Sequence, residues 1–418
     1  MDPNKIVKIV APKNPVIARP AIPPSKSLLI RLRLLEYLSS GKITTDAHSD
    51  AEDVLLMKNL IWWIKHCSSS RIPMVVDVGN SGAVGRFLLA ALSAMPGKWF
   101  ATGDKRMKQR PVGPLVDALL ELNADLSYSG RKGFLPVMIH GKEKLKGMAT
   151  LKSKESSQYL SALLMSLSFG KEECLIQTTN QLINDPYVKM TASLLQKAGL
   201  QPEMGDGLIK ISPGKAETVK ASVEADWSSA SFWFEVAALS PGSQIVLEGL
   251  NRESLQGDAV LPEIYEELGV RASFKNETLL IENTGNHTDH FEYDMQRNPD
   301  LVMPVAATCA GLGIGCKLRG VSRLRLKESD RLSALAMTFQ SAGLDVKVEN
   351  DDVFILEKGR FRPAGVFTTF DDHRMAMSLA PLALISGKIE LENPDVVRKS
   401  YPAFWGELKN AGFEIMFK

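Results

Sequence analysis

Few features of this 418-residue sequence suggest a secreted, membrane-spanning or nucleic-acid-binding protein. Its four cysteines have no CxxC spacing, which indicates neither a disulfide scaffold nor a zinc motif, and we expect buried, reduced thiols. No apolar run reaches the roughly 20 residues that span a bilayer. The formal net charge of +2 gives no general attraction to nucleic acid or acidic lipid, so any basic site must be local. The cysteines are Cys67, Cys174, Cys309 and Cys316.

Targeting and metal-binding patterns are also missing. The first residues, 1–5, lack the basic and then apolar pattern of a signal peptide and the composition of a transit peptide. His287 and His290 lie in a polar stretch with no third ligand nearby, so we predict neither a metal nor another cofactor. With 44% hydrophobic and 23% charged residues, the sequence predicts a soluble cytoplasmic protein of two domains. No heptad or long apolar patch is present, so we expect a monomer.

A repeat of about 70 residues organises the chain. Six helix-length segments are apolar on nearly all sides, and each begins with a small or polar cluster. A helix that is apolar all round is buried, so these six should form the cores. They are residues 25–38, 80–92, 156–168, 226–239, 299–312 and 371–385.

Six amphipathic segments alternate with the apolar ones. Several end in a glycine that fits a helix C-cap, such as Gly199 and Gly343, and short β-branched strands follow, as at residues 346–348 and 353–356. This predicts a βαβα-rich module repeated six times, three copies in each domain, with the boundary near residues 221–224. The segments are residues 49–64, 111–123, 185–198, 258–268, 328–342 and 401–411.

Basic residues cluster at the starts of the apolar helices. Lys26 lies in the first turn of a helix that Ser25 or Ser27 could cap, where a cation opposes the helix dipole. Lys327 and Arg331 are four residues apart and could share a helix face. Helix starts that gather with cations would bind a multiply charged anion. The other basic residues at such positions are Arg31, Arg86, Arg110, Arg374 and Lys399.

Each of these features has a simpler interpretation when taken alone. The polar residues at a single helix start could serve only to cap the helix, and this applies to Asp372-His373 as well. Residues 105–110 alone are typical of a solvated loop. Residues 79–86 lack both the GxGxxG spacing and the Walker lysine, so they predict no nucleotide fold. No aromatic residues interleave the basic loop, which disfavours nucleic acid. Six such starts in register favour the anion site.

Seven motifs, in order, resemble the EPSP synthases (3-phosphoshikimate 1-carboxyvinyltransferases), a family of enolpyruvyl transferases. The resemblance extends from about Val16 to Pro402. One such match would be weak, whereas seven in the right order are specific. The motifs are residues 24–31, 79–86, 106–113, 156–160, 224–231, 326–331 and 372–377.

The resemblance implies a two-domain inside-out α/β barrel of six βαβαββ units, with helix N-termini facing the interdomain cleft. Residues 1–23 and 224–418 would form one domain and residues 24–223 the other. The implied reaction transfers the enolpyruvyl group of phosphoenolpyruvate to the 5-hydroxyl of shikimate 3-phosphate, through a tetrahedral intermediate and with release of phosphate. By the same resemblance, Asp300, Glu328 and Lys26 would be catalytic.

The resemblance also assigns two sets of binding residues. The set for shikimate 3-phosphate is Lys26, Ser27, Arg31, Ser156, Ser157, Gln158, Asn184, Asp300, Arg323 and Lys327. The set for phosphoenolpyruvate is Lys26, Gly82, Arg110, Gln158, Arg331, Arg374 and Lys399. Arginine suits these roles because its planar fork can bind phosphate or carboxylate oxygens in pairs.

The sequence departs from the family pattern at three positions. Asn184 stands where a serine is frequent, Arg323 where an asparagine is common, and Ala83 where a threonine often follows the glycine. The first two put those substrate contacts in doubt. Gly82 is retained, so we expect glyphosate to compete with phosphoenolpyruvate.

Three other functions were weighed. A sister enzyme that uses UDP-N-acetylglucosamine usually has a cysteine in the loop at residues 105–111 and an asparagine after the lysine, and neither is present here. A catalytically dead anion-binding protein would be expected to lose Asp300, Glu328 or Lys26. RNA binding is disfavoured by the near-neutral charge.

Overall fold

The computed structural model describes residues 5–67, 72–151, 156–276 and 278–418. The chain forms two compact units: unit 1 is Met1–Ser25 with Glu224–Lys418, and unit 2 is Lys26–Val223. The chain therefore passes between the units twice. In unit 1 the two crossing segments pair, since Pro24 forms an antiparallel bridge with Ala225 and the Ser25 amide donates to the Glu224 carbonyl at 2.9 Å.

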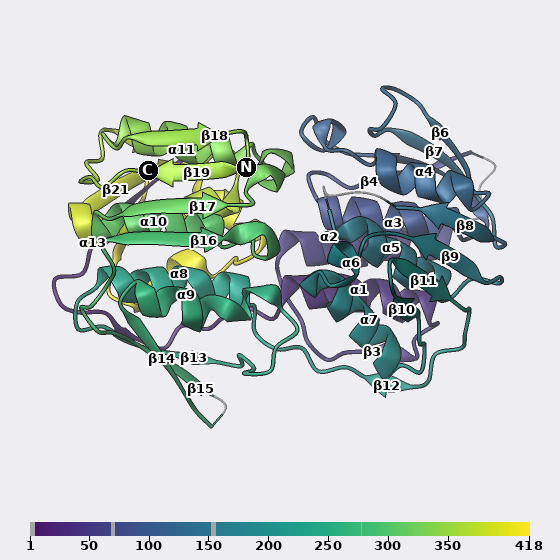
Figure 1. The fold of residues 1–418 in the computed structure, drawn as a ribbon, viewed down its shortest axis with the longest axis horizontal. Coiled ribbons are helices and arrows are strands. Elements are labelled where there is room, and N and C mark those ends of the chain that lie inside the picture. The colour runs from purple at the N-terminus through teal and green to yellow at the C-terminus, as the bar shows by residue number, and fades with distance from the viewer. Residues whose placement is uncertain (1–4, 68–71, 152–155, 277) are drawn as a thin grey trace. The chain divides into compact units, whose positions relative to one another are not determined.

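The described part of unit 1 contains three four-stranded sheets with one shared strand order. The order β16, β17, β19, β18 of one of them can be followed in Figure 1. In each sheet two parallel strands are followed by an antiparallel pair, which is the βαβαββ pattern. The sheets are β2 (Ile17–Ala18), β13 (Gln244–Glu248), β15 (Thr278–Asn283) and β14 (Val270–Lys275); β16 (His290–Asp294), β17 (Gly315–Arg319), β19 (Val353–Leu356) and β18 (Val346–Glu349); and β20 (Val366–Phe367), β21 (Lys388–Glu392), β1 (Ile6–Val10) and β22 (Glu414–Phe417).

Two sheets of unit 2 repeat this order, and the third has only two parallel strands among the described residues. Only residues 68–73 lie between helix α2 (Glu52–Cys67) and β4. The sheets are β4 (Met74–Asp77), β5 (Gly97–Thr102), β7 (Val137–Gly141) and β6 (Asp125–Tyr128); β8 (Gly147–Thr150), β9 (Cys174–Gln177), β11 (Leu208–Ile211) and β10 (Glu203–Gly205); and β12 (Val219–Lys220) with β3 (Ile43–Thr44).

The predicted apolar helices form the two cores. In unit 1, α10 packs against α8 and α12, and in unit 2, α3 packs against α5. The helix predicted over residues 371–385 is interrupted at η5 (Ala380–Leu382), where Pro381 has no amide hydrogen to donate, and it resumes as α13 (Ala383–Ser386). The six are α1 (Lys26–Leu38), α3 (Gly82–Ser93), α5 (Gln158–Leu167), α8 (Trp227–Leu239), α10 (Val302–Leu312) and α12 (His373–Leu379).

The predicted amphipathic helices are present as well, and glycines end them as expected. Gly199 and Gly343 have φ of 78° and 81°, the left-handed conformation that a helix C-cap requires. These helices are α2 (Glu52–Cys67), α4 (Gly113–Glu121), α7 (Pro186–Lys197), α9 (Leu261–Glu267), α11 (Arg331–Ser341) and α14 (Phe404–Asn410). The short ones are α6 (Asn180–Ile183), η1 (Met107–Gln109), η2 (Gly257–Val260), η3 (Met295–Arg297), η4 (Ser322–Leu326) and η6 (Pro394–Lys399).

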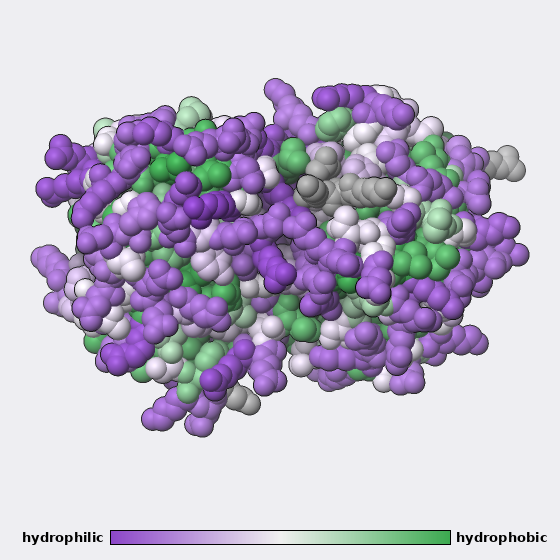
Figure 2. Space-filling model, viewed as in Figure 1, coloured by the Kyte–Doolittle hydropathy of each residue, from purple (hydrophilic) through white to green (hydrophobic). Residues whose placement is uncertain are grey.

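The two-domain α/β architecture is therefore confirmed. Hydrophilic side chains cover much of the face of each unit in Figure 2, and each unit encloses its own apolar cluster. Cys174, Cys309 and Cys316 are buried and free of disulfides, as predicted, while the side chain of Cys67 lies outside the described set. Among the described residues, no helix combines the length and apolarity needed to cross a membrane.

Candidate active site

Asp300 is the centre of an ion-pair cluster in unit 1. Its Oδ1 accepts from Lys327 Nζ at 3.2 Å and from Arg331 Nη1 at 2.9 Å, and its Oδ2 lies 3.1 Å from Arg374 Nη2. Glu328 joins the cluster through a 2.9 Å contact between its Oε2 and Arg331 Nη2. All five charged residues were predicted site residues, and the fold brings them together.

A buried pair between Arg331 and Asp372 fixes this cluster. Arg331 Nε donates to Asp372 Oδ2 at 2.8 Å and Nη2 donates to Oδ1 at 3.2 Å, with the side chains 1% and 0% exposed. Ser329 also donates to Asp372 Oδ2, and the Arg374 amide donates to Oδ1 at 3.0 Å. Asp372 is thus the N-cap of α12, as one interpretation of the sequence predicted. It also fixes the position of Arg331 through the buried ion pair.

The prediction that Lys327 and Arg331 share a helix face is wrong. The Asp330 carboxylate accepts from the Ser333 amide and caps α11, so the helix begins at Arg331 rather than at Glu328. Lys327 has an extended backbone at the end of η4. Its ammonium and the Arg331 guanidinium are close because both bind Asp300, and not because of helical spacing.

The electrostatics of this cluster are strongly perturbed. Burial alone would raise the pKa of Asp300, but the charges of Arg374, Lys327 and Arg331 hold it well below its usual range. Burial lowers the pKa of Lys327, an effect that Asp300 partly offsets. Burial likewise disfavours the charged form of Arg331, yet Asp372, Glu328 and Asp300 raise its pKa overall. The cluster is an acid surrounded by cations.

A second buried carboxylate of unit 1 interacts electrostatically with this cluster. Asp258 is 1% exposed, and its Oδ2 accepts a short hydrogen bond from the Ser228 hydroxyl near the start of α8. The Asn298 side chain donates to the Gly257 carbonyl at 2.7 Å, which ties the segment before Asp300 to η2. Sequence reasoning did not select Asp258.

Two other predicted residues of unit 1 are outside the hydrogen bonds just described. Lys399 ends η6, which packs against α12, the helix that carries Arg374, and its side chain is half-buried. Arg323 lies half-buried in η4. Their substrate contacts stay predictions.

In unit 2, Gly82, Arg110 and Gln158 of the predicted binding sets lie near the start of α3. Arg110 Nη1 donates to the Asn80 carbonyl at 3.1 Å, and Arg86 Nη1 donates to Gln158 Oε1 at 2.6 Å. A Cβ placed on Gly82 would lie 2.5 Å from Arg110 Nη2 and 2.9 Å from Arg86 Nη1. The absence of a side chain at Gly82 therefore allows both guanidinium groups to reach this helix start.

Arg31 is a buried cation on α1 whose hydrogen bonds all go to neutral oxygens. Its Nε donates to Thr191 Oγ1 at 2.7 Å, and its Nη groups donate to the carbonyls of Ser27 and Tyr187 at 2.8 and 3.3 Å and to Ser161 Oγ at 3.4 Å. Burial lowers the pKa of Arg31 to about 10, although Tyr187 and Asp185 oppose the shift. A guanidinium held by hydroxyls and carbonyls can still gain from binding an anion.

Lys26 is held by a carboxylate that sequence reasoning did not select. Its Nζ lies 3.0 Å from Asp53 Oδ2, and both side chains are largely buried. Asp53 is in the first turn of α2, where an acid is usual because of the helix dipole, so its sequence position gave no separate signal. Ser25, one of the two predicted caps, does not cap α1 with its side chain, since its buried hydroxyl has no hydrogen-bond partner among the described residues.

The remaining predicted residues of unit 2 lie near helix starts. The Ser156 hydroxyl accepts from the Gln158 amide at 3.2 Å, and Ser157 is the buried residue before α5. Ser27 is half-buried in the first turn of α1. Asn184 donates to the Asn180 carbonyl at 2.9 Å within its own helical turn, so its side chain is already engaged.

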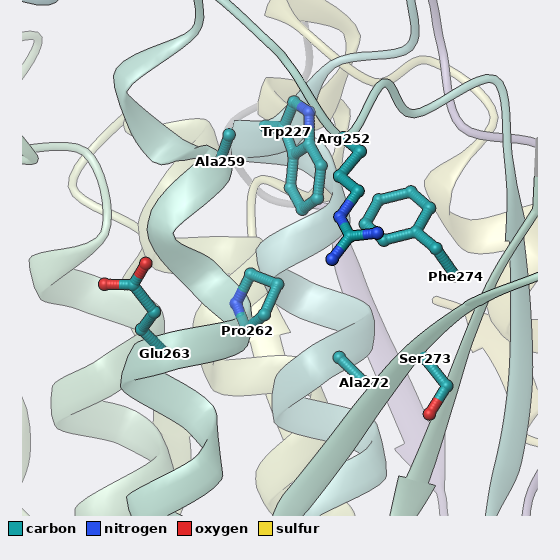
Figure 3. A pocket seen from close by; sticks show the side chains of 8 residues that line it. All are labelled: Trp227, Arg252, Ala259, Pro262, Glu263, Ala272, Ser273 and Phe274. Carbon is teal, nitrogen blue, oxygen red and sulfur yellow. The ribbon is translucent and has the colours of Figure 1, made fainter.

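A pocket of about 500 Å³ in unit 1 contains none of the predicted site residues. In Figure 3 the Arg252 guanidinium extends toward the Phe274 ring, and the Glu263 carboxylate points away from the other labelled side chains. The site is assigned to the charged clusters instead, because they hold the acids, bases and cations. The pocket is lined by Trp227, Arg252, Ala259, Pro262, Glu263, Ala272, Ser273 and Phe274.

Comparison with known proteins decides the family. The model of the family described as EPSP synthase (3-phosphoshikimate 1-carboxyvinyltransferase) matches residues 10–408. The chain belongs to the EPSP synthase family. The match covers both clusters, and the resemblance predicted from seven motifs is confirmed.

Individual relatives agree with this assignment. The chain is 35% identical over 397 residues to the 3-phosphoshikimate 1-carboxyvinyltransferase of Bacteroides fragilis, covering 94% of this chain and 95% of the relative. It is 32% identical to the enzyme of the same name from Methanoculleus marisnigri, with 96% and 99% covered. The solved structure of EPSP synthase from Acinetobacter baumannii is similar in fold, with a TM-score of 0.72, 22% identity and 99% and 100% coverage.

Proposed function

We propose that the charged clusters of unit 1 and unit 2 carry out the reaction of the EPSP synthase family, the transfer of the enolpyruvyl group from phosphoenolpyruvate to the 5-hydroxyl of shikimate 3-phosphate. Membership of the family and the names of the relatives support this activity in the shikimate pathway. The observation that carries the proposal is Asp300, a carboxylate in contact with three cations. Each substrate bears a phosphate and a carboxylate, and such cations could neutralise them.

The two anions would use different residues. Arg31, with its hydrogen bonds to neutral groups, suits the phosphate of shikimate 3-phosphate. Gly82 and Arg110 suit phosphoenolpyruvate, because a bare helix start beside a guanidinium binds an anion well. The other proposed contacts for shikimate 3-phosphate are Lys26, Ser27, Ser156, Ser157, Gln158, Asn184, Asp300, Arg323 and Lys327, and those for phosphoenolpyruvate are Lys26, Gln158, Arg331, Arg374 and Lys399.

The chemistry we propose is addition followed by elimination. Asp300 accepts the proton of the 5-hydroxyl while that oxygen bonds to C2 of phosphoenolpyruvate, and Glu328 or Lys26 donates a proton to the methylene carbon. The product of addition is a tetrahedral intermediate. Loss of a proton from its methyl group to the same acid–base pair then breaks the C2–O bond to phosphate and releases phosphate.

The ion pairs of Asp300 control how readily its carboxylate accepts a proton before and after the substrates bind. With Lys327, Arg331 and Arg374 bound to it, the pKa of Asp300 is held well below its usual range, and its carboxylate is a weak base. Substrate phosphate and carboxylate groups would compete for the same cations. Binding would thereby weaken the pairs and raise the basicity of Asp300 when the 5-hydroxyl is in place.

Some properties go beyond family membership. We propose a cytoplasmic monomer that needs no cofactor, in keeping with the composition. We also propose that glyphosate competes with phosphoenolpyruvate, because Gly82 leaves the start of α3 open. Undiminished activity at millimolar glyphosate with limiting phosphoenolpyruvate would contradict that competition.

A phosphate-release assay tests the function. Purified protein is mixed with phosphoenolpyruvate alone, with shikimate 3-phosphate added, or with UDP-N-acetylglucosamine added. We expect phosphate only with shikimate 3-phosphate. Release with the nucleotide sugar instead would identify the sister activity. No release with either acceptor would indicate a protein that binds anions without turning them over.

A further inference from the structure

We propose that Asp258 is a positioning residue that tunes the basicity of Asp300: its buried carboxylate, held beside the segment that leads to Asp300, adds a second negative charge and strengthens Asp300 as a base. This inference rests on the proposed role of Asp300 as proton acceptor and extends it to a residue outside the predicted set. Asp258 would touch neither substrate.

The placement of Asp258 is built into the fold of unit 1. The turn that carries it is fixed on one side by Gln256, whose side chain accepts from the Trp227 amide at 3.1 Å and donates to the Ala225 carbonyl at 2.8 Å. On the other side, the side chain of Asn298, which is two residues before Asp300 in the sequence, donates to the Gly257 carbonyl. The carboxylate is therefore held against the start of α8 and beside the Asp300 segment.

No cation forms a hydrogen bond with Asp258 among the described residues. Oδ2 accepts from the Ser228 hydroxyl, and Oδ1 is buried with no hydrogen-bond partner. A buried carboxylate with so few partners is costly and is unusual unless it has a function. The charged groups that act on it electrostatically are Asp300 just before α10, Arg374 from α12 and Asp226, the cap of α8.

The carboxyl group of Asp258 ionises within the pH range over which the rate can be compared. Its pKa is raised to about 6, first by burial and then by the charge of Asp300, while Arg374 and the Ser228 hydrogen bond oppose the shift. Electrostatic repulsion is mutual, so an ionised Asp258 raises the proton affinity of Asp300. Above about pH 6 Asp258 is charged and Asp300 is the stronger base, and below it this support is lost.

The variant Asp258→Asn removes the charge and keeps an oxygen that can accept from Ser228. We expect the ratio of wild-type to D258N single-turnover rates to be near 1 at pH 5 and to rise to about 3–10 at pH 7.5, because one pKa unit is tenfold in proton affinity and rates follow only part of it. KM for both substrates should change little. A ratio that is constant across the range, or a change confined to KM, would overturn the inference.

Two further variants control this test. Glu235→Gln replaces another fully buried carboxyl of unit 1, one that acts on Tyr265, and should leave the pH profile unchanged. Ser228→Ala removes the hydrogen bond that lowers the pKa of Asp258, so the rise in rate should move to higher pH. S228A also keeps the test decisive if D258N folds poorly, since an unmoved profile in S228A contradicts the inference.

The failure of this inference is distinguishable from failure of the proposed function. If Asp300→Asn retains full activity, Asp300 is not the base and the proposed mechanism is wrong. If D300N is inactive while D258N follows the wild-type pH profile, only the role of Asp258 is wrong.

Discussion

Arg331 and Asp372 form a doubly hydrogen-bonded ion pair in the core of unit 1, with Nε–Oδ2 and Nη2–Oδ1 distances of 2.8 and 3.2 Å. The same guanidinium contacts Asp300 and Glu328, so one arginine joins three acids. The start of α11 and the start of α12 are thereby held together through a single side chain.

Removing one member of this pair should be costly. We expect Asp372→Ala to lower the free energy of unfolding by about 3–5 kcal/mol, because it leaves a buried guanidinium short of its main partner. Urea unfolding at pH 7 measures the change. Asp289→Ala, which removes an exposed ion pair with Lys358, is the control and should leave stability almost unchanged. Equal effects of the two variants would contradict this account.

Glu235 should make stability depend on pH. Its carboxyl is 0% exposed in α8, neither oxygen has a hydrogen-bond partner among the described residues, and burial raises its pKa well above its usual value. A group whose pKa is raised on folding stabilises the protein fully below its unfolded pKa, near 4.5, and that contribution is lost as pH rises through the folded pKa.

The measurement is urea unfolding of wild type and Glu235→Leu at pH 5 and pH 8.5. Leucine is of similar size and cannot ionise, so the variant should gain on wild type as the pH rises. A stability difference that is the same at both pH values would show that the Glu235 carboxyl does not titrate on unfolding.

Gly82→Ala should weaken phosphoenolpyruvate binding without unfolding unit 2. The new Cβ would displace the Arg110 guanidinium from its place 2.5 Å away. Loss of one charge-assisted hydrogen bond corresponds to about a tenfold rise in KM for phosphoenolpyruvate, with KM for shikimate 3-phosphate much less affected. Gly406→Ala in α14, where a Cβ meets open space, is the matched control. An unchanged KM in G82A would remove Gly82 from the binding set.

Binding of shikimate 3-phosphate to Arg31 should raise the thermal stability of the protein. Shikimate 3-phosphate at about 100 times its Kd should stabilise the protein by about 2.7 kcal/mol, detectable as a rise in Tm. Arg31→Met should lose most of that rise. Arg33→Met, which removes the ion pair with Glu36 on the same helix, should retain it. A full rise in R31M would show that Arg31 does not hold the phosphate.

The sequence predicted the helices and strands of this fold better than their boundaries. The apolar helices and their small or polar starts are visible as periodicity, because burial on all sides leaves a recognisable pattern. The start of α11 was misplaced because Lys327 and Glu328 also fit a helix, and only the Asp330 cap decides where it begins. The described residues contain no antiparallel strand pair beside β3, and only residues 68–73 separate α2 from β4.

The cations of the site and the acids Asp300 and Glu328 were predictable, whereas the acids Asp53 and Asp258 were not. Lys26 and Arg331 are the first residues of α1 and α11, where a cation opposes the helix dipole, so they attract notice. Asp53 and Asp258 stand where an acid is ordinary, in the first turn of a helix or in a polar turn. Their partners come from segments distant in sequence, and only the tertiary structure reveals those contacts.

The central claim is that this chain transfers the enolpyruvyl group with Lys26 among its catalytic residues. Phosphate release by wild type and Lys26→Met, with phosphoenolpyruvate and shikimate 3-phosphate both saturating, tests it most directly. The account predicts release by wild type that needs both substrates and a loss of at least about 100-fold in K26M, as expected for a general acid–base group. Release by K26M within about threefold of wild type would contradict it.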